Sequence, residues 1–448
     1  MVAVLLILLG LLALIILASN IASRGIRISE LDFRSKRAYF LAESGIEDAV
    51  FRLKRGKGIS SSYTLSFYGE ITTVTLTTVP GGREIHSEAS VKNSHRIVQS
   101  TVAQGTGAGF AYAVQIGQGG IDLENNAQII GSVYSDGNIS GKNISQITQD
   151  AFAAGTSIIN GENSFTIQGN ARAHGINNVT ISKSASSTTY LTNSDIGINA
   201  YANSISSSDI TKDAYYLTSI TSSQVGGSTF PGTPPPADLP VIPFPISDAQ
   251  IDQWKTSAEA GGIYTGPCPY VLTEDTTDLG PIKINCDFSA QNTAIVNVKG
   301  TIWVSGNFEL RNSAQLRLDP FYGSFSEALI ADNISNRLTS STIEIEDSSQ
   351  VLGSGAPNSY LALISRNNSA ENGGTVPAIQ PKNNVDASIY YAPHGLIQIT
   401  NSSALKEVTA YQLKISNDAV VTYESGLAST QFAGPTGGID IVNWREAE

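Results

Sequence analysis

The sequence is poor in the side chains that carry most enzyme chemistry. Its 448 residues include only four histidines and two cysteines. The histidines, which we read as surface or turn residues, are His86, His95, His174 and His394. None has zinc-ligand spacing or stands beside a nucleophile motif, and no GxSxG, Walker or dinucleotide fingerprint occurs. The sequence therefore predicts no catalytic residue, no metal site and no cofactor.

Charged residues are also scarce, at 15% of the chain, while Gly, Ser, Thr and Asn are abundant. That balance is typical of exposed β-rich proteins rather than cytosolic helical enzymes. The net charge of -12 is uneven, because residues 24–57 carry nine Lys/Arg against five Asp/Glu, which leaves -16 for the rest. A body this acidic repels a phosphate backbone, so we expect no nucleic-acid partner. The basic stretch indicates either a membrane-proximal position or a solvated helix face.

The N-terminus holds the longest apolar stretch. Residues 2–18 are drawn only from Val, Ala, Leu, Ile and Gly, and the first charged side chain is Arg24. About 20 apolar residues suffice to span a bilayer, so this stretch predicts a single membrane span. A cleaved signal peptide is the alternative, but the sequence lacks a convincing basic region and an Ala-x-Ala-like cleavage site.

Helical periodicity continues beyond this stretch, and no proline occurs before Pro80. It predicts one helix that runs to about Arg55 and ends at Gly56 and Gly58. Small and apolar residues recur on one face, where they would let helices approach closely in lipid or in a filament. This candidate assembly face consists of Ala38, Leu41, Ala42, Gly45, Ala49 and Leu53.

The phrase AYFLAESGIEDA, from Ala38 to Ala49, resembles the N-terminal domain of PilX-type minor pilins of type IV pili. That family's signature is an Ala-x-x-x-Ala-Glu-Ala-Gly-like phrase followed by a further Ala. Here the matching residues are Ala42, Glu43, Ser44 and Gly45, with Ser44 in place of the usual Ala. The resemblance covers roughly the first 55 residues. It implies a pilin helix that anchors the chain in the cell membrane and then joins other pilin subunits in a fimbrium.

The start of the chain departs from that family. Type IV prepilins carry a short basic leader ending in Gly, and most have a Glu five residues into the mature chain, where this sequence has Leu5. We expect either a leader encoded upstream of Met1 or a mature end made in another way. The basic residues after the apolar stretch place that side in the cytoplasm by the positive-inside rule. The resemblance and the cysteine pair described below favour an exoplasmic body, which is the orientation we expect.

After Gly58 the periodicity changes from helical to alternating. Strands are predicted over residues 63–67, 71–79, 84–91 and 96–102, with turns at 80–82 and 92–95. Short strands joined by tight turns predict an antiparallel meander with one face free to pack on the preceding helix. We assign residues 1–58 to the helix and residues 59–104 to the meander.

From about residue 113 a motif recurs in which an apolar residue, a polar turn, a small residue and a second apolar residue follow one another. The copies span residues 123–129, 167–173, 310–316, 345–351, 399–405 and 415–421. Asn, Asp and Gly tolerate the left-handed backbone of a tight corner, and Ala or Ser fits where coils stack closely. The fold class is therefore mainly β, with an irregular β-solenoid-like body over residues 105–226 and 263–448. The uneven spacing leaves a β-sandwich with Asn-rich hairpins as the alternative.

Residues 227–262 lie between the two parts of this body. Their proline-rich stretch, residues 231–245, is extended, and it either separates the two parts or straps them together. Ser247 to Gln250 predicts a capping box for a short helix through Trp254 to Ala260. Beyond it, turn-forming residues between Cys268 and Cys286 can bring their backbones together. This favours a disulfide worth ~3 kcal/mol over two free thiols.

Two groups of acidic residues are the remaining candidates for acid–base catalysis or calcium binding. One group consists of Glu274, Asp275 and Asp278, and the other consists of Glu344, Glu346 and Asp347. The alternation of two of them with isoleucines indicates the outward face of a strand, so we read both groups as solvated surface. We expect a pilin-like surface subunit that is not an enzyme and whose long polar body contacts a cell-surface glycan or protein. The alternatives are a membrane-anchored solenoid enzyme acting on polysaccharide and a structural envelope protein.

Overall fold

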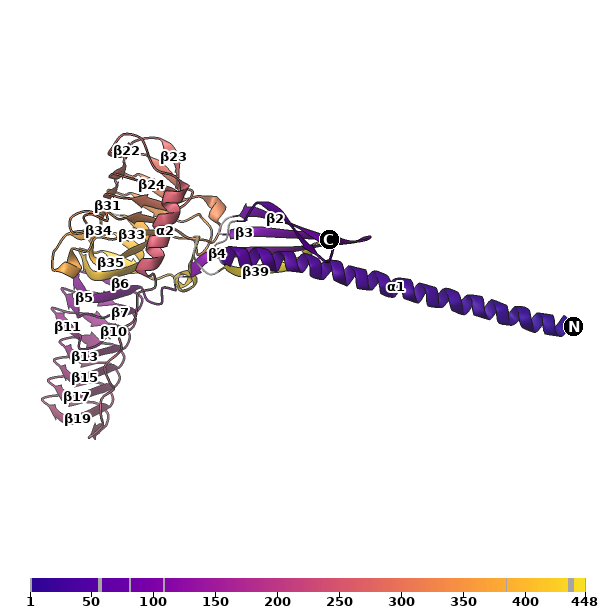
Figure 1. Ribbon diagram of the computed structural model, residues 1–448. Helices are drawn as coiled ribbons and strands as arrows, with labels where there is room; N and C mark the ends of the chain where they lie inside the picture. The colour runs from indigo at the N-terminus through magenta and orange to yellow at the C-terminus, as the bar shows by residue number, and fades with distance from the viewer. Residues whose placement is uncertain are drawn as a thin grey trace. The chain divides into compact units, whose positions relative to one another are not determined.

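The computed structural model describes residues 2–54, 59–79, 82–107, 109–383, 385–433 and 439–447. The chain divides into two compact units (Figure 1). Unit 1 consists of residues 1–105 and 437–448, and unit 2 consists of residues 106–436.

Unit 1 combines one long helix with an antiparallel sheet. Helix α1 spans Val2–Lys54, as the periodicity predicts. The sheet strands are β1 (Ser62–Phe67), β2 (Glu70–Val79), β3 (Gly82–Val91), β4 (Ser94–Gly107) and β39 (Ile439–Ala447). The first four follow one another in the sheet as an antiparallel meander, which confirms that prediction. Of the predicted turn at residues 80–82, Pro80 and Gly81 lie outside the described residues.

The fifth strand of unit 1 comes from the end of the chain. β39 pairs antiparallel with β4, and Trp444 lies opposite Ser100. We had placed all of residues 263–448 in the solenoid-like body, so the structure differs here. The physical reason is that the far edge of β4 carries unpaired backbone groups, which a strand from any part of the sequence can satisfy.

The core of unit 1 lies between the C-terminal part of α1 and one face of the sheet. Ala42, Ile46 and Ala49 of the helix contact Val74 of β2 and Ile85 of β3 in one buried cluster. Alternate residues of the strands face the helix because successive side chains of a strand point to opposite faces. One face of the meander therefore packs on the helix, as the sequence indicates.

Unit 2 is built from short strands that pair in parallel with strands one coil further along the chain. The first part contains β5 (Val114–Glu124), β6 (Gln128–Ile130), β7 (Val133–Ser135), β8 (Ile139–Lys142), β9 (Gln146–Ile147), β10 (Ala151–Ala153), β11 (Ile158–Glu162), β12 (Thr166–Ile167), β13 (Ala171–Asn177), β14 (Thr180–Ile181), β15 (Ala185–Thr192), β16 (Asp195–Ile196), β17 (Ala200–Ser206), β18 (Asp209–Ile210), β19 (Ala214–Thr221), β20 (Gln224–Val225) and β21 (Thr229–Pro231). We call this arrangement the parallel stack.

The second part of the stack has the same pairing. It contains β22 (Tyr270–Leu272), β23 (Thr276–Leu279), β24 (Ile282–Ile284), β25 (Phe288–Ala290), β26 (Ile295–Val298), β27 (Ile302–Val304), β28 (Phe308–Leu310), β29 (Gln315–Leu318), β30 (Glu327–Ala331), β31 (Ile343–Glu346), β32 (Gln350–Leu352), β33 (Leu361–Ser365), β34 (Pro377–Lys382), β35 (Asp386–Ile399), β36 (Ala404–Ser416) and β37 (Val420–Thr422). All described pairings within the stack are parallel. The prediction of a mainly β chain with one long N-terminal helix is confirmed.

The two parts form one continuous stack, although they are far apart in the sequence. The last coil of the second part pairs with the first coil of the first part, β36 with β5 and β37 with β6. The chain therefore enters the stack in its middle, builds the first part outward, and later returns to build the second part back to the entry point (Figure 1).

Asparagine corners hold successive coils in register. In most of the predicted copies the corner residues have left-handed backbone, including Asn125 (φ 53°) and Asn417 (φ 58°). The copy at residues 167–173 does not, since neither Gly169 nor Asn170 has positive φ. Side-chain amides form a ladder in which each Nδ2 donates to the preceding residue's Oδ1, in the order Asp347, Asn383, Asn401, Asn417, Asn125, Asn143 and Asn163. The ladder crosses the junction between the two sequence parts.

The proline-rich segment runs back along the stack, and we call residues 232–246 the strap. Its carbonyl groups accept hydrogen bonds from successive coils: from Arg172 to Ala237 (2.6 Å), from the Gly155 amide to Leu239 (2.8 Å) and from Gln115 to Pro243 (3.0 Å). Proline has no N–H, so a proline-rich segment is suited to a place where the neighbouring surface supplies the donors. Of the two alternatives from the sequence, the structure has the strap.

Helix α2 (Asp248–Gly261) follows the strap and packs on the side of the stack. Its capping box is present, because the Ser247 hydroxyl accepts from the Gln250 amide and the Gln250 side chain accepts from the Ser247 backbone. Trp254 is buried against Phe432, with ring centroids 5.0 Å apart. The remaining short elements are η1 (Pro320–Tyr322), η2 (Ala370–Asn372), η3 (Ser425–Ser429) and β38 (Gln431–Ala433).

Candidate functional site

The candidate assembly face of α1 is occupied by the chain's own sheet. Ala38, Leu41, Ala42, Gly45 and Ala49 are buried, and Leu53 is half-buried. A Cβ added at Gly45 would stand 2.2 Å from the Ser87 Oγ of β3. The small residues let the helix approach strands, not another helix. The predicted assembly role of this stripe is therefore corrected to intramolecular packing.

The residues that match the pilin signature, Ala42 to Gly45, also pack within unit 1. Ala42 and Gly45 face the sheet, the Ser44 hydroxyl donates to the Leu41 carbonyl oxygen (2.7 Å), and Glu43 is half-buried. Ser44 also lines a shallow cleft of about 230 Å³ between the helix and the turn that joins β1 to β2.

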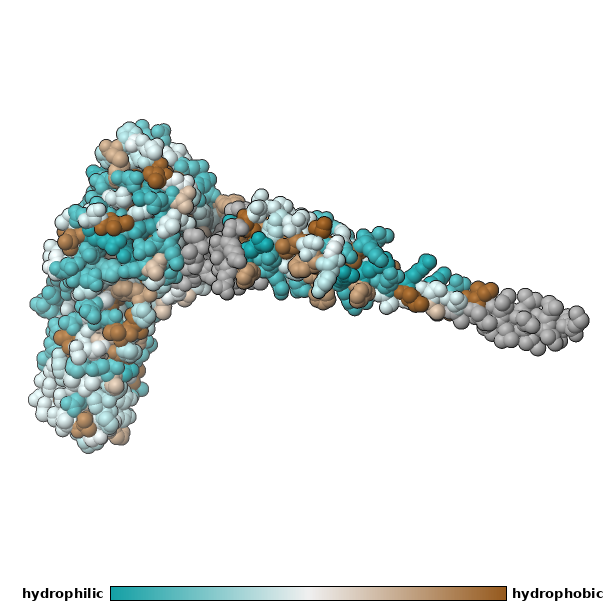
Figure 2. All heavy atoms as spheres, in the orientation of Figure 1, coloured by the Kyte–Doolittle hydropathy of each residue, from teal (hydrophilic) through white to brown (hydrophobic). Residues whose placement is uncertain are grey.

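The described side chains of α1 before Arg34 have no partner from the chain's own sheet. From Ser19 to Phe33 every described side chain is exposed, and large apolar residues such as Ile26 (69%) and Phe33 (66%) are among them. Figure 2 shows these hydrophobic residues interspersed with polar ones along the helix. Pairs one turn apart, Glu30 with Arg34 and Asp32 with Lys36, support the helix from within.

No helix in the described part of the chain is long and apolar enough to cross a membrane. The predicted span depends on residues 2–18, whose backbone is helical. The side chains of residues 2–15, 17 and 18 lie outside the description.

Four of the six predicted acidic residues are engaged in ion pairs or hydrogen bonds. Lys382 contacts both Glu344 and Glu346 on β31, and Asp347 accepts from Asn383 in the asparagine ladder. Burial opposes ionisation of Glu344, but the bonds from Lys382 hold its pKa below the ordinary value. In the other group Asp278 accepts from Asn297 (2.7 Å), while Glu274 and Asp275 are exposed. Across the described residues, no three His, Cys, Asp or Glu side chains are arranged to hold a metal ion.

The two cysteines are bonded to each other in the structure. The Cα atoms of Cys268 and Cys286 are 5.9 Å apart, and the disulfide joins the segment before β22 to the turn before β25. It therefore ties together two successive coils at one end of the stack.

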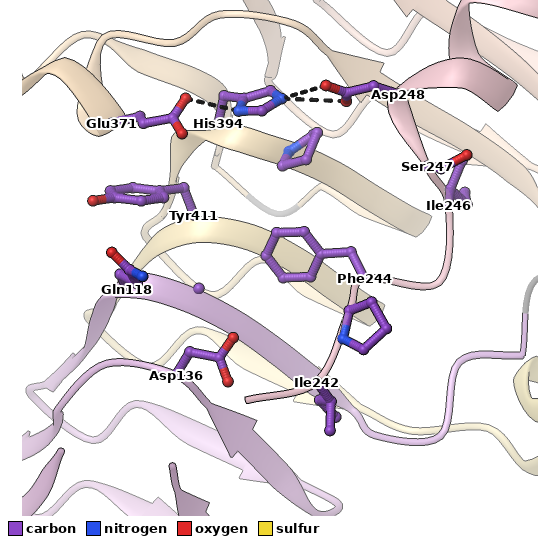
Figure 3. A pocket seen from close by; sticks show the side chains of 13 residues that line it. Gln118, Asp136, Ile242, Phe244, Ile246, Ser247, Asp248, Glu371, His394 and Tyr411 are labelled. Atoms are coloured by element: carbon purple, nitrogen blue, oxygen red, sulfur yellow. Dashed lines mark hydrogen bonds and ion pairs between the residues drawn. The ribbon is translucent and has the colours of Figure 1, made fainter. Parts of the chain in front are cut away.

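Sequence reasoning missed a cleft of about 440 Å³ in unit 2. It lies where the two parts of the stack meet, and the strap forms one of its walls (Figure 3). Four adjacent coils depart from regular pairing at this level, at residues 393–395 of β35, 411 of β36, 117–120 of β5 and 136–138 after β7. Irregular pairing bends a strand locally and re-aims its side chains, so aligned irregularities open a notch in an otherwise smooth face.

The middle of the cleft is apolar and aromatic. Phe244 of the strap and Tyr411 of β36 are both half-buried and line it from different elements (Figure 3). Gly117 makes the space between them, since a Cβ there would come within 3.2 Å of the Phe244 ring and 3.4 Å of the Tyr411 Cα. A glycine inside a strand is a sign of such close approach.

One end of the cleft holds a histidine between two carboxylates. His394 Nδ1 lies 2.7 Å from Glu371, and Nε2 lies 3.0 Å from Asp248 at the start of α2. The hydrogen bond to Asp248 is the main cause that raises the pKa of His394, and the same bond lowers the pKa of Asp248. Arg366 also contacts Asp248 (2.9 Å). We had read His394 as a surface or turn residue, whereas it closes the upper end of this cleft.

The other end of the cleft holds a carboxyl group with an unused oxygen. Asp136 accepts a hydrogen bond from the backbone of Ile242, and burial raises its pKa. Its Oδ1 is buried and has no hydrogen-bond partner among the described residues. A buried polar atom without a partner costs free energy, which a bound water molecule or ligand that donates to this oxygen would offset.

Little in the sequence announces this cleft. Its residues come from segments as distant as 117 and 411, and none belongs to a catalytic or metal-binding motif. The available signals were the glycines at 117, 119 and 120 inside an otherwise strand-like stretch, and the Pro393-His394-Gly395 interruption of another.

Comparisons with known proteins leave the family open. No protein-family model matches the sequence, and no curated protein matches it. Among solved structures, the crystal structure of the competence-associated pilin ComZ from Thermus thermophilus aligns with 92% of this chain and 97% of that chain, at 13% sequence identity and a TM-score of 0.29. An alignment at this level does not establish a shared fold or a shared activity.

Proposed function

We propose that this chain is a pilin-like surface subunit, held in the cell membrane by its N-terminal helix and then assembled with other pilin subunits into a fimbrium. The body would be exoplasmic, with unit 2 as a β-solenoid-like domain that contacts other surfaces. The PilX-like phrase at residues 38–49 belongs to this proposal, as a resemblance of the N-terminal region only.

The observation that carries the proposal is the unsupported part of α1. At 1.5 Å per residue the helix is ~80 Å long, and only its C-terminal part packs on the sheet. Leaving one large apolar side chain in water instead of burying it costs about 1.5–3 kcal/mol. Ile21, Ile26, Ile28, Leu31 and Phe33 together make an isolated helix an unfavourable end state. Lipid or neighbouring helices would remove this cost.

The assembly surface moves accordingly from the buried stripe to the opposite side of the helix. Ile26, Phe33, Phe40 and Phe51 are exposed and follow one another at intervals of whole turns, so they share one face. We assign this face to contacts between subunits. We assign the protein no catalytic role. Of the acidic residues considered for one, Glu344 and Glu346 are held by Lys382, and Asp347 belongs to the asparagine ladder.

Cross-linking in the cell envelope tests the proposal. Both native cysteines are in the disulfide, so a new cysteine is the sole free thiol. Ile26→Cys, on the exposed face of α1, should give cross-linked multimers with a short bismaleimide and should be recovered in sheared surface filaments. Ile334→Cys, an exposed position of unit 2, is the matched control and should give markedly fewer multimers.

The proposal fails if Ile26→Cys gives no multimers while the thiol reacts fully with a monofunctional maleimide. It also fails if the full chain, purified without detergent or lipid, stays monomeric and freely soluble.

A further inference from the structure

We propose that the cleft between the two parts of the stack is a binding site for a neutral, hydroxyl-rich saccharide chain of about three sugar units. This inference goes beyond the proposed pilin-like function and does not depend on it, since it uses only residues of unit 2.

The dimensions of the cleft suit a short linear chain. It crosses four adjacent coils, from Pro393 on β35 to Asp136 after β7. Neighbouring strands are about 4.8 Å apart, so three steps give a length of about 14 Å. With a volume of about 440 Å³, the cleft falls within the range of small-molecule sites.

The distribution of polar groups favours hydroxyl groups as the partners. The polar groups that line the cleft include the Asp136 carboxyl group, the exposed Gln118 amide and the Tyr411 hydroxyl. A hydroxyl group both donates and accepts, so it can match any of these. The half-buried rings of Phe244 and Tyr411 between them offer apolar surface to the C–H face of a sugar ring.

The charges argue against a cationic ligand, which is the main competitor for an acidic cleft. Asp248 is already paired with Arg366 and His394, and Glu371 is paired with His394. Asp136 remains, but burial raises its pKa and so disfavours the charge that a cation would need. A sugar hydroxyl can donate to the unpartnered Oδ1 when the group is ionised, and can accept from it when the group is protonated.

The cleft is also more than a packing defect. Its shape depends on irregularities in four coils at one level, on a glycine whose absent side chain leaves room beside the Phe244 ring and the Tyr411 backbone, and on a strap that supplies Phe244. If unit 2 served stability alone, we would expect side chains to fill the cleft, because an unfilled space and an unpartnered buried oxygen both cost free energy.

Saturation-transfer NMR and calorimetry on the full chain in detergent micelles test the inference. The probes are maltotriose, cellotriose and triacetylchitotriose, with trilysine as the cationic competitor. We expect at least one trisaccharide to bind, and saturation of aromatic protons to transfer to its ring C–H protons. Removing a hydrogen bond from a buried group costs about tenfold in affinity, so Asp136→Ala should weaken binding by about that factor.

Two further variants keep the test decisive. Tyr411→Ala removes the aromatic surface of a half-buried residue and should also weaken binding about tenfold, even if Asp136→Ala loosens the strap. Asp209→Ala, at an exposed residue of β18, is the control and should bind as the parent does. Absence of binding by all three trisaccharides overturns the inference. So does trisaccharide binding that all variants retain, or trilysine binding that Asp136→Ala abolishes while no sugar binds.

The outcome is separable from that of the proposed function. The cross-linking test reads contacts of α1 in unit 1, whereas the saccharide test reads a cleft in unit 2. A failure of either leaves the other standing.

Discussion

Glu327 on β30 should make the stability of unit 2 fall as the pH rises. The side chain is 3% exposed, and its Oε1 accepts from the Ala328 amide (3.0 Å) and the Thr301 hydroxyl (2.9 Å). Burial is the main cause that raises its pKa to about 8 from the ordinary 4.5. The Tyr322 hydroxyl donates to the Lys299 carbonyl oxygen (2.9 Å) and, at 3.4 Å, to Oε2 of Glu327. These hydrogen bonds lower the pKa of Glu327, and burial outweighs them.

The sign follows from the two pKa values. Between pH 4.5 and about 8 the folded chain holds a proton at Glu327 that the unfolded chain has lost. Stability is therefore fully present at low pH and is lost as the pH rises through that window. One pKa unit corresponds to about 1.4 kcal/mol, so two pH units inside the window change the free energy of unfolding by at most about 3 kcal/mol. Above pH 8 the contribution levels off.

Glu327→Gln removes this dependence, because an amide does not titrate while its oxygen can still accept from Ala328 and Thr301. The free energy of unfolding of the variant minus that of the parent should rise by about 1.4 kcal/mol per pH unit between pH 5.5 and 7.5. Urea unfolding followed by tryptophan fluorescence measures it. A Trp444→Phe background leaves Trp254 and Trp303, both in unit 2, as the reporters.

The slope of the difference in unfolding free energy against pH, rather than the constant part of that difference, decides the outcome. Other titrating groups cancel in the difference, and a constant offset reflects only the change from acid to amide. Glu162→Gln, at an exposed residue of β11, is the control and should give parallel pH curves. If Glu327→Gln also gives parallel curves, Glu327 is ionised in the folded chain and the reasoning is refuted.

Three other changes test the packing. Asn125→Ala should lower the stability of unit 2 by roughly 1–3 kcal/mol, because it breaks the amide ladder and puts a strained residue at φ 53°. Asn125→Gly should recover part of this in thermal unfolding, and equal loss in both variants would leave only the ladder as the cause. Gly45→Ala should destabilise unit 1 by roughly 1–3 kcal/mol, because the added Cβ meets the Ser87 Oγ. Adding Ser87→Ala should restore part of the lost stability. Unchanged unfolding of Gly45→Ala would contradict the packing of α1 on β3. Reduction of the Cys268–Cys286 disulfide should lower the free energy of unfolding by ~3 kcal/mol, measured as a lower unfolding midpoint. The double variant Cys268→Ser/Cys286→Ser should show the same lower midpoint, and adding reductant to that variant should not change it.

The sequence by itself determined the local elements, because their signals lie within a few residues. Uninterrupted helical periodicity before Pro80 predicts α1, alternation predicts β1 to β4, and Ser247 with Gln250 predicts the start of α2. Asparagine at a corner, as at Asn125, reports a left-handed backbone directly.

A period within the stack was available but missed. Ala171, Ala185, Ala200 and Ala214 pair in register along successive coils, as do Asp195 and Asp209. The spacing between these alanines is about the number of residues in one coil. The recurring motif of the sequence analysis lies at a different corner of the coil, where its copies are unevenly spaced.

Only the tertiary structure decided which surface covers which. A stripe of small residues permits close approach by any partner, and here the partner of Gly45 is β3 of the same chain. The junction of β36 with β5, the return of β39 to β4 and the course of the strap are pairings between distant segments, which local periodicity does not encode. The cleft depends on all of these except β39, because Asp136, Phe244 and Tyr411 meet only after the two parts of the stack have joined.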